Sequence, residues 1–158
     1  MSTLLGHELT AELCERLSGK EIGAQEGKVI LLVTVDDRNW PHPAMLSYRE
    51  VVAKSAKRID VAVGKASTSA RNLRERGNLA IVLTDAGMNF YIKGKATETV
   101  SALAPVPFMS VFRVDVEQLI EDQEPGAAIT GGITFRRDQT SEAARIGEKV
   151  FRALTEQV

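Results

Sequence analysis

The chain has 158 residues, of which 44% are hydrophobic and 26% are charged, a size and composition that predict one globular domain spanning residues 1–158. The 20 Lys and Arg residues balance 21 Asp and Glu residues, and this net charge of −1 excludes a general attraction to nucleic acid or to an anionic membrane. The single cysteine, Cys14, cannot form an intramolecular disulfide, and no apolar run reaches the ~18 residues of a membrane-spanning helix. Because no signal-like N-terminus is present either, we expect a cytoplasmic protein.

The first segment carries a helical pattern. Its leucines recur at every fourth residue, at Leu5, Leu9, Leu13 and Leu17. This spacing places an apolar stripe on one face of a helix, and Gly19 would end it. We therefore predict an N-terminal helix over residues 1–19.

From Lys28 onward the pattern changes to short segments rich in β-branched and aromatic residues, separated by Gly, Asn, Asp and Pro. The segments are "KVILLVTV", "PAMLSYREVVA", "RIDVAVG", "NLAIVLTD", "MNFYIKGKATETV" and "FMSVFRVDVEQLI". Such segments are typical of strands, so we predict at least six strands within a core of residues 28–120. Many strands at close spacing favour a barrel or a sandwich.

The polar turn "DDRNWPHP" joins the first two of these segments. Aspartate side chains can bond their own backbone, Asn39 tolerates a left-handed conformation, and the prolines fix φ where the next strand begins. These features predict a hairpin. Trp40 is expected to cover the end of this hairpin or to contact a partner.

Two further helices are predicted. The segment "STSARNLRERG" offers three hydroxyl side chains as the helix cap and a glycine as the stop. A last helix is expected from about residue 140 to residue 155, where apolar residues fall on one face. Together with the Gly-rich stretch "EPGAAITGGITFRRDQ", interpreted as a mobile loop followed by a short strand, it forms a C-terminal region of residues 121–158.

Taken together, these segments resemble the pyridoxamine 5'-phosphate oxidase-like family of FMN-binding split barrels. The resemblance extends from the N-terminal helix to "KGKATE" and depends on the order and spacing of "LLVTVD", "DDRNWPHP", "IDVAVG", "STSARNL", "NLAIVL" and "YIKGKATE". It implies a mainly β (α+β) fold, a six-stranded split β-barrel with flanking N-terminal, central and C-terminal helices. It also implies a homodimer with FMN at the subunit interface.

The resemblance implies where the flavin ring would lie. In the family the strand after the polar turn runs along the flavin, which corresponds here to "AMLSY", with "VAV" beside it. An apolar slot and nearby backbone groups suit the ring, and Ser47 is expected nearest its polar edge. Asn89 falls where family members can carry an amide that faces the cofactor; alternatively, it is a turn residue at the start of a strand. The expected ring contacts are Met45, Leu46, Ser47, Val61, Ala62, Val63 and Asn89.

The phosphate of FMN would lie at the start of the central helix, where free N–H groups and the helix dipole favour an anion. Hydroxyl groups and two basic side chains add donors there. The expected phosphate contacts are Lys65, Ser67, Thr68, Ser69 and Arg71. Family members often carry Lys or Arg where this chain has Thr68 and Ser69, so the alternative is a solvated helix cap that binds nothing.

The sequence assigns no catalytic residue. It lacks the basic, histidine-containing C-terminal segment of true pyridoxamine 5'-phosphate oxidases, and His7, His42 and Cys14 are too scattered for a metal site. The chemistry would then come from the flavin, in an FMN-dependent oxidoreductase that acts on a small molecule, with a reduced nicotinamide or a deazaflavin as electron donor. The alternatives are a non-catalytic flavin-binding or redox-sensing protein, and a split-barrel interaction module that has lost FMN.

Overall fold

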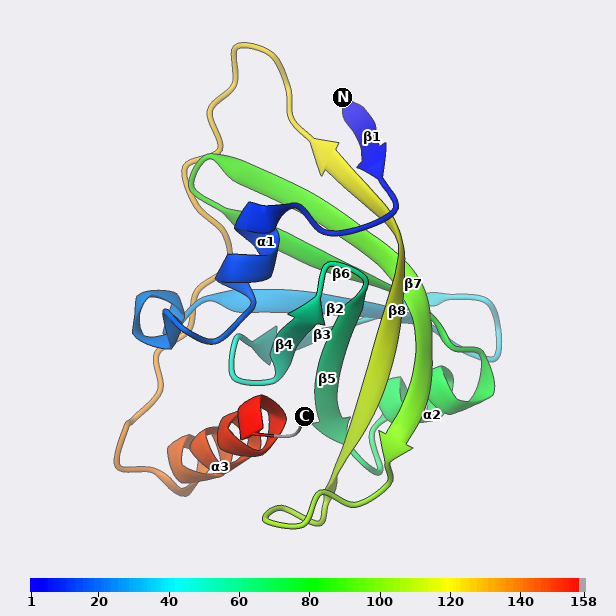
Figure 1. The fold of residues 1–158 in the computed structure, drawn as a ribbon, viewed down its shortest axis with the longest axis vertical. Coiled ribbons are helices and arrows are strands. Elements are labelled where there is room, and N and C mark those ends of the chain that lie inside the picture. The colour runs from blue at the N-terminus through cyan, green and yellow to red at the C-terminus, as the bar shows by residue number, and fades with distance from the viewer. Residues whose placement is uncertain (157–158) are drawn as a thin grey trace.

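A computed structural model describes residues 1–156, which form one curled antiparallel sheet and three α-helices (Figure 1). The strands are β1 (Ser2–Gly6), β2 (Val29–Val35), β3 (Pro41–Ser47), β4 (Val51–Ser55), β5 (Arg58–Gly64), β6 (Asn78–Asp85), β7 (Met88–Val100) and β8 (Met109–Asp122). The helices are α1 (Ala11–Arg16), α2 (Thr68–Glu75) and α3 (Glu142–Glu156), and a 3₁₀ turn covers Ile22–Gln25. No helix within residues 1–156 is long and apolar enough to cross a membrane.

The sheet curls because its two edges are joined by a tight turn. Its strand order is β3-β2-β6-β7-β8-β5-β4, with β1 added beside β8. The edge strands β3 and β4 follow each other in the chain, and only residues 48–50 lie between them. Three residues span at most about 11 Å, so the two edges must approach each other at this turn. The result is a split barrel.

The sheet has eight strands rather than the expected six. One difference is that "PAMLSYREVVA" forms two strands, β3 and β4, with the turn at Tyr48–Glu50 between them. The other is β1, whose residues were expected to be helical. The N–H of Glu50 donates to the carbonyl of Ser47 at 3.1 Å, which closes the turn.

The predicted helix over residues 1–19 is wrong in its first half. Residues Ser2–Gly6 pair with the end of β8, where the long strand would otherwise present an unpaired edge. The helix starts after Thr10, whose hydroxyl accepts a hydrogen bond from the N–H of Leu13. Leu9, Leu13 and Leu17 are buried as the pattern predicted, but Leu5 is 45% exposed.

The interior of the barrel is apolar. Alternate residues of β2 and β6, among them Ile30, Leu32 and Ile81, are fully buried and pack with Phe112 of β8. A second apolar cluster lies on the other side of β5, where Ala62 packs with residues of α3. The inward face of the strands is therefore apolar because it forms the barrel core. The second cluster explains why α3 packs against β5.

The local predictions at the hairpin and at α2 are confirmed. Asp36 accepts from the N–H groups of Arg38 and Trp40, and Asn39 has a φ of 63°. Ser67 is the cap of α2, since its hydroxyl accepts from the N–H of Ala70 at 3.1 Å. Trp40 is 67% exposed, so it does not pack over the hairpin.

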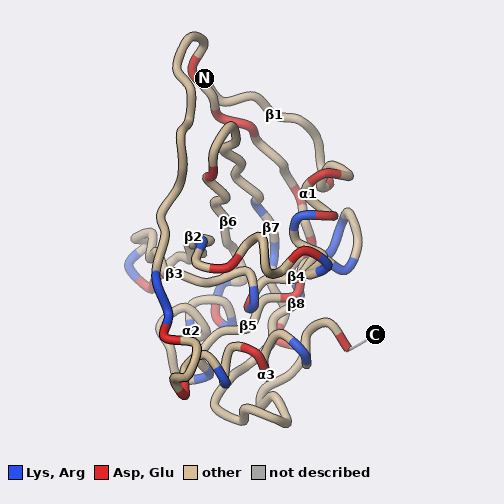
Figure 2. The backbone as a smooth tube through the Cα atoms, turned by 90° about the vertical axis from the view of Figure 1, so that its left-hand side faces the viewer, with Lys and Arg blue, Asp and Glu red and all other residues tan. Residues whose placement is uncertain are grey.

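A long extended segment connects β8 to α3, and Figure 2 shows it running along one side of the molecule, with basic residues close to its lower end. We refer to residues 129–137 as the strap. The strap is bonded to the barrel at both ends: the N–H of Gly87 donates to Ile129, and the N–H of Phe135 donates to Gly27. The expected short strand is a single bridge between Lys28 and Thr134.

Candidate functional site

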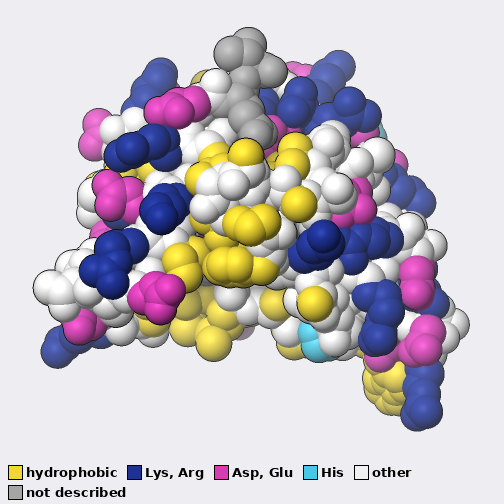
Figure 3. Space-filling view, turned by 90° about the horizontal axis from the view of Figure 1, so that it is seen from below, with side chains coloured by type: hydrophobic (Ala, Val, Ile, Leu, Met, Phe, Trp, Pro, Cys, Tyr) yellow, Lys and Arg dark blue, Asp and Glu magenta, His cyan; other side chains and the backbone are white. Residues whose placement is uncertain are grey.

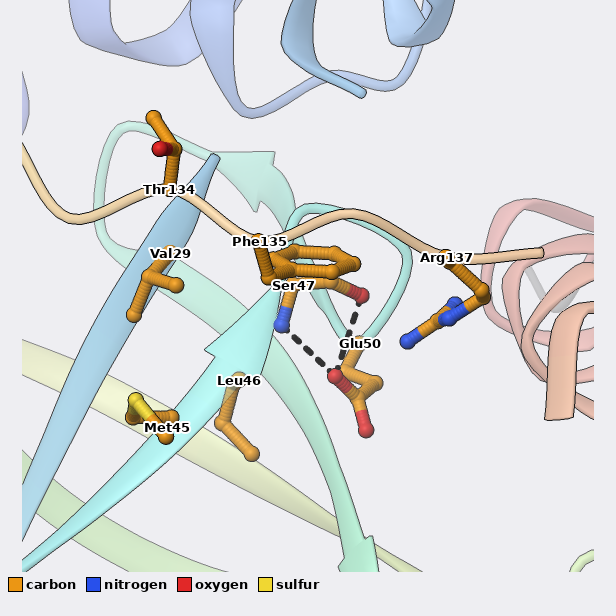
Figure 4. Close-up of a pocket in the computed structure, with 8 residues that line it drawn as sticks. All are labelled: Val29, Met45, Leu46, Ser47, Glu50, Thr134, Phe135 and Arg137. Atoms are coloured by element: carbon orange, nitrogen blue, oxygen red, sulfur yellow. Dashed lines mark hydrogen bonds between the residues drawn. The ribbon is translucent and has the colours of Figure 1, made fainter. Parts of the chain in front are cut away.

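A cavity of about 230 Å³ opens between the end of β3 and the strap (Figure 4). Strands β2 and β3 supply an apolar floor, the turn after β3 supplies a carboxylate, and the strap supplies an aromatic ring and a guanidinium. Its lining residues are Val29, Met45, Leu46, Ser47, Glu50, Thr134, Phe135 and Arg137. Three of them, Met45, Leu46 and Ser47, are among the residues that the sequence assigned to the flavin ring.

Glu50 is held in a fixed position by the turn. One carboxylate oxygen, Oε2, accepts from the N–H of Ser47 at 2.6 Å and from the hydroxyl of Ser47 at 3.0 Å. Within residues 1–156 no group donates a hydrogen bond to the other oxygen, Oε1. Burial raises the pKa of Glu50, while the bonds from Ser47 and the charge of Arg137 oppose this rise. The cavity therefore contains a carboxylate oxygen that is free to accept.

Arg137 faces Glu50 from the strap, and its guanidinium points toward the carboxylate in Figure 4. The guanidinium carbon lies 5.1 Å from the centre of the Phe135 ring, which is within the range of a cation–π contact. On the α3 side, a Cβ at Gly147 would lie 2.8 Å from Nη1 of Arg137. The absence of a side chain at Gly147 thus leaves room for the guanidinium.

A second cavity, of about 270 Å³, lies on the other side of Val29 under the strap. Its walls are the outward side chains of β2 and β6 and the glycine pair of the strap. Its lining residues are Val29, Leu31, Val82, Thr84, Gly131, Gly132 and Ile133. A Cβ at Gly132 would lie 1.9 Å from the carbonyl oxygen of Thr84, so only glycine allows the strap to lie this close to β6.

The outer face of the sheet beside these cavities is apolar. Residues directly opposite in an antiparallel pair share a face, and the register aligns Met45, Leu31 and Val82 in one row across β3, β2 and β6. The next row contains Pro43 and Val33. Met45 is 69% exposed, and its neighbours in the row are half-buried. A band of apolar surface therefore extends from the first cavity along β3.

The structure does not bring the "VAV" residues of β5 into either cavity. Val61 and Val63 are buried in the barrel core, and Ala62 faces the second apolar cluster. The backbone of β5 is joined to the turn beside the first cavity, where the N–H of Ala62 donates to the carbonyl of Glu50 at 2.8 Å. Their contact with a flavin stays a prediction without support from the geometry.

The side chain of Asn89 is occupied by internal hydrogen bonds. Its Oδ1 accepts from the hydroxyl of Thr84 at 2.7 Å, and its Nδ2 donates to Tyr91 and to the carbonyl of Asp122. Asn89 therefore lies beside the second cavity, through Thr84, but its amide is directed into the start of β7. This arrangement fits the alternative reading of Asn89 as a strand-start residue.

The helix α2, whose start carries the predicted phosphate residues, packs against β2 beside the other end of β3. The amide of Asn72 in α2 donates to the hydroxyl of Thr34 at 3.0 Å, and Thr34 lies opposite His42 of β3. His42 and Ser47 are five residues apart on one strand, a separation of about 17 Å. The middle of α2 and the first cavity thus lie near opposite ends of β3.

At the start of α2, the first N–H groups have no partner within the helix, and the cap hydroxyl satisfies only that of Ala70. Lys65 and Arg71 are exposed, Ser67 and Thr68 are half-buried, and Ser69 is buried. Figure 3 shows the molecule of Figure 1 from below, and α2 lies in the lower half of Figure 1. On this lower face, Lys and Arg side chains lie on both sides of a hydrophobic centre. The helix start can therefore offer N–H groups and nearby positive charge to an anion.

Neither Glu50 nor the strap residues are selected by sequence reasoning. The sequence pattern predicts Glu50 within a continuous strand, and it predicts a mobile loop followed by a short strand where the strap lies. The available signal was the alternation of "ITFRR", in which Ile133, Phe135 and Arg137 fall on one side of an extended chain. A Gly-Gly pair just before it was a second signal for close approach of two backbones.

No protein-family profile matches the chain. YclD, an uncharacterised protein of Bacillus subtilis, is 28% identical to this chain in an alignment 153 residues long that covers 92% of this chain and 95% of YclD. A pyridoxamine 5'-phosphate oxidase-like protein of Lactobacillus delbrueckii matches with a TM-score of 0.59 at 15% identity over 75% of this chain and 98% of its own. An FMN-binding protein of Syntrophomonas wolfei matches with a TM-score of 0.51 at 17% identity over 72% of this chain and 88% of its own.

These likenesses define the class of fold. The chain has the split-barrel fold of the pyridoxamine 5'-phosphate oxidase-like proteins, as its sequence resemblance predicted. At these identities the likeness concerns the fold alone, so ligand and activity have to be argued from the site.

Proposed function

We propose that this protein binds FMN along the outer side of β3 and works as a flavin-dependent oxidoreductase on a small molecule. The observation that carries this proposal is the apolar band along the outer side of β3, which ends in a cavity with polar groups, while α2, with basic residues near its start, packs beside the other end of β3. A flavin mononucleotide has this same sequence of parts: a flat ring with a polar edge, a ribityl chain and a phosphate.

The residues present fit the ring. Met45, Leu46 and Val29 offer apolar contact, and Phe135 offers an aromatic face. Glu50 and Arg137 provide an acceptor and a donor for a polar edge, and Ser47 orients Glu50 by two hydrogen bonds. Bound FMN would supply hydride transfer, and the chain would bind the ring and exclude water from it.

The proposal places the phosphate of FMN at the start of α2. The unpaired N–H groups at the start of α2 and the hydroxyl of Thr68 would donate hydrogen bonds to the phosphate of FMN. Lys65 and Arg71 would balance the charge of this phosphate. The phosphate contacts are therefore fewer and more exposed than the ring contacts.

A homodimer completes the proposal. Met45, at 69% exposed, and Trp40, at 67% exposed, lie on the β3 side of the molecule beside the half-buried Leu31 and Val82. A second copy of the chain that covers this apolar surface would place the flavin between two subunits. Light scattering is expected to give about twice the 17.2 kDa chain mass, and a monomer at micromolar concentration with FMN present would contradict the shared site.

The absorbance spectrum of the purified protein tests FMN binding directly. We expect a yellow protein with flavin bands, or a colourless protein that becomes yellow with added FMN. Bleaching by a reduced nicotinamide or a reduced deazaflavin supports the oxidoreductase. A flavoprotein that neither donor bleaches supports a storage or sensing role instead, and a protein that ignores FMN supports an interaction module. The cytoplasmic location stays a prediction.

A further inference from the structure

We infer that Glu50 and Arg137 together recognise the pyrimidine edge of the flavin ring, and that the C-terminal strap is thereby part of the cofactor site. The inference rests on the proposed function, since it concerns which groups of this chain hold the flavin. Neither Glu50 nor Arg137 was among the residues that the sequence assigned to the cofactor.

The pair selects the chemistry of its ligand. The carboxylate of Glu50 repels a phosphate or carboxylate group that would approach Arg137, and the guanidinium of Arg137 repels a cation that would approach Glu50. A neutral edge that carries a hydrogen-bond donor beside an acceptor satisfies both groups. The isoalloxazine ring has this edge, because its N3–H lies between two carbonyl oxygens.

The structure holds both groups ready for such an edge. Ser47 occupies Oε2 of Glu50 with two hydrogen bonds, which leaves Oε1 to accept from the ring N3–H. Arg137 has five donors in a rigid plane; contact with Phe135 limits its orientation, and Gly147 leaves room for the guanidinium. The floor of Val29 and Leu46 provides the apolar surface that a flat ring requires.

Arg137 is tested by a matched pair of substitutions. Arg137→Leu removes the donor, while Arg136→Leu removes the same charge from the neighbouring exposed residue, which does not line the cavity. Hydrogen bonds to charged groups contribute enough that Arg137→Leu should weaken flavin binding about tenfold to a hundredfold. The loss should be equal for FMN and for riboflavin, which lacks the phosphate, and Arg136→Leu should leave both affinities within about twofold of wild type.

Glu50 is tested with a modified ligand. N3-methylriboflavin cannot donate from N3, so the wild-type protein should bind it roughly tenfold or more weakly than riboflavin. In Glu50→Gln the amide oxygen stays with Ser47 and an NH₂ group faces the ring, which removes the acceptor. This variant should bind riboflavin more weakly and lose the discrimination between the two ligands.

The reduction potential gives a readout that a purely structural role would not change. Reduced flavin carries negative charge at its pyrimidine edge, so the guanidinium should favour the reduced form. We expect Arg137→Leu to lose about tenfold more affinity for reduced flavin than for oxidised flavin. For a two-electron couple, this difference lowers the midpoint potential of the bound flavin by about 30 mV relative to wild type.

The outcomes separate this inference from the proposed function. If wild-type protein binds no flavin by fluorescence titration, the proposed function fails. If it binds flavin but Arg137→Leu matches Arg136→Leu, or if Glu50→Gln keeps the full discrimination against N3-methylriboflavin, the inference is overturned while flavin binding stands. Circular dichroism spectra and urea midpoints equal to wild type show that each variant is folded.

Discussion

The two ends of β3 differ in how completely they are built. At the Ser47 end, groups from four parts of the chain converge: the floor from β2 and β3, a carboxylate from the turn, a ring and a guanidinium from the strap, and space from α3. At the His42 end, the α2 start offers N–H groups and exposed basic side chains. If the proposed flavin site is correct, the Ser47 end would supply most of the specificity for the ligand, whereas the His42 end would supply mainly charge.

The largest effect is expected from lifting the strap. In Gly132→Ala the new Cβ meets the backbone carbonyl of Thr84, so the strap must move away from β6. The strap would carry Arg137 and the ring of Phe135 away from the cavity, and loss of a charged contact of about 1.5–3 kcal/mol together with the ring contact would weaken flavin binding roughly a hundredfold or more. Gly131→Ala is the control, because a Cβ there meets nothing within 4 Å. Equal affinities for riboflavin in the two variants would show that the strap does not contribute to the Ser47 end.

The His42 end is tested by Arg71→Ala. If Arg71 makes a charge-assisted contact with the phosphate, FMN affinity falls about tenfold to a hundredfold, and riboflavin affinity stays unchanged. Titration of both ligands by flavin fluorescence measures the two effects. An equal loss for FMN and riboflavin would mean that Arg71 supports the fold rather than the phosphate.

A smaller effect is expected from Gly147→Ala, which acts on the Ser47 end without touching a ligand. The added methyl group displaces the flexible end of Arg137, and alanine raises the helix propensity of α3 by up to about 1 kcal/mol. Flavin binding should weaken roughly threefold, less than 1 kcal/mol, while the urea midpoint stays equal or rises. A fall in the midpoint would show that Gly147 is needed for packing instead.

The smallest effect concerns pH. Because burial raises the pKa of Glu50 above that of the unfolded chain, the folded state binds this proton more strongly. The stabilisation from Glu50 is fully present below the unfolded pKa and is lost as pH rises through the folded pKa. The free energy of unfolding of wild type should therefore decline relative to Glu50→Gln across this interval, in urea titrations at several pH values. A constant difference would contradict the raised pKa.

Local sequence signals predicted most strands and two of the three helices. Alternation of apolar residues placed β2 and β6, and Ser67 and Asn39 were predicted from chemistry that acts within a few residues. The leucine spacing identified Leu9, Leu13 and Leu17 as buried but wrongly extended the helix to the N-terminus. That error is physical in origin, because pairing of β1 with the distant end of β8 outweighed the local helical preference.

The candidate site was predicted only in part. Met45, Leu46 and Ser47 do line a cavity, but Val61 and Val63 lie in the core because their side chains face the inside of the barrel. Alternation along a strand says which residues share a face, but it does not say whether that face is inside the barrel or outside it.

The sequence by itself determined the mainly β character of this protein, its hairpin and the cap of α2, since all of these depend on periodicity and on bonds between near neighbours. The tertiary structure decided that β3 and β4 meet as two edges of one curled sheet, and that the strap crosses β2 and β6. It also decided that Arg137, distant in sequence, faces Glu50. Contacts between residues far apart in the chain depend on the closure of the sheet and on the close approach that Gly132 and Gly147 permit. Sheet closure and close approach leave no periodic signal in the sequence, so these contacts could not be predicted from it.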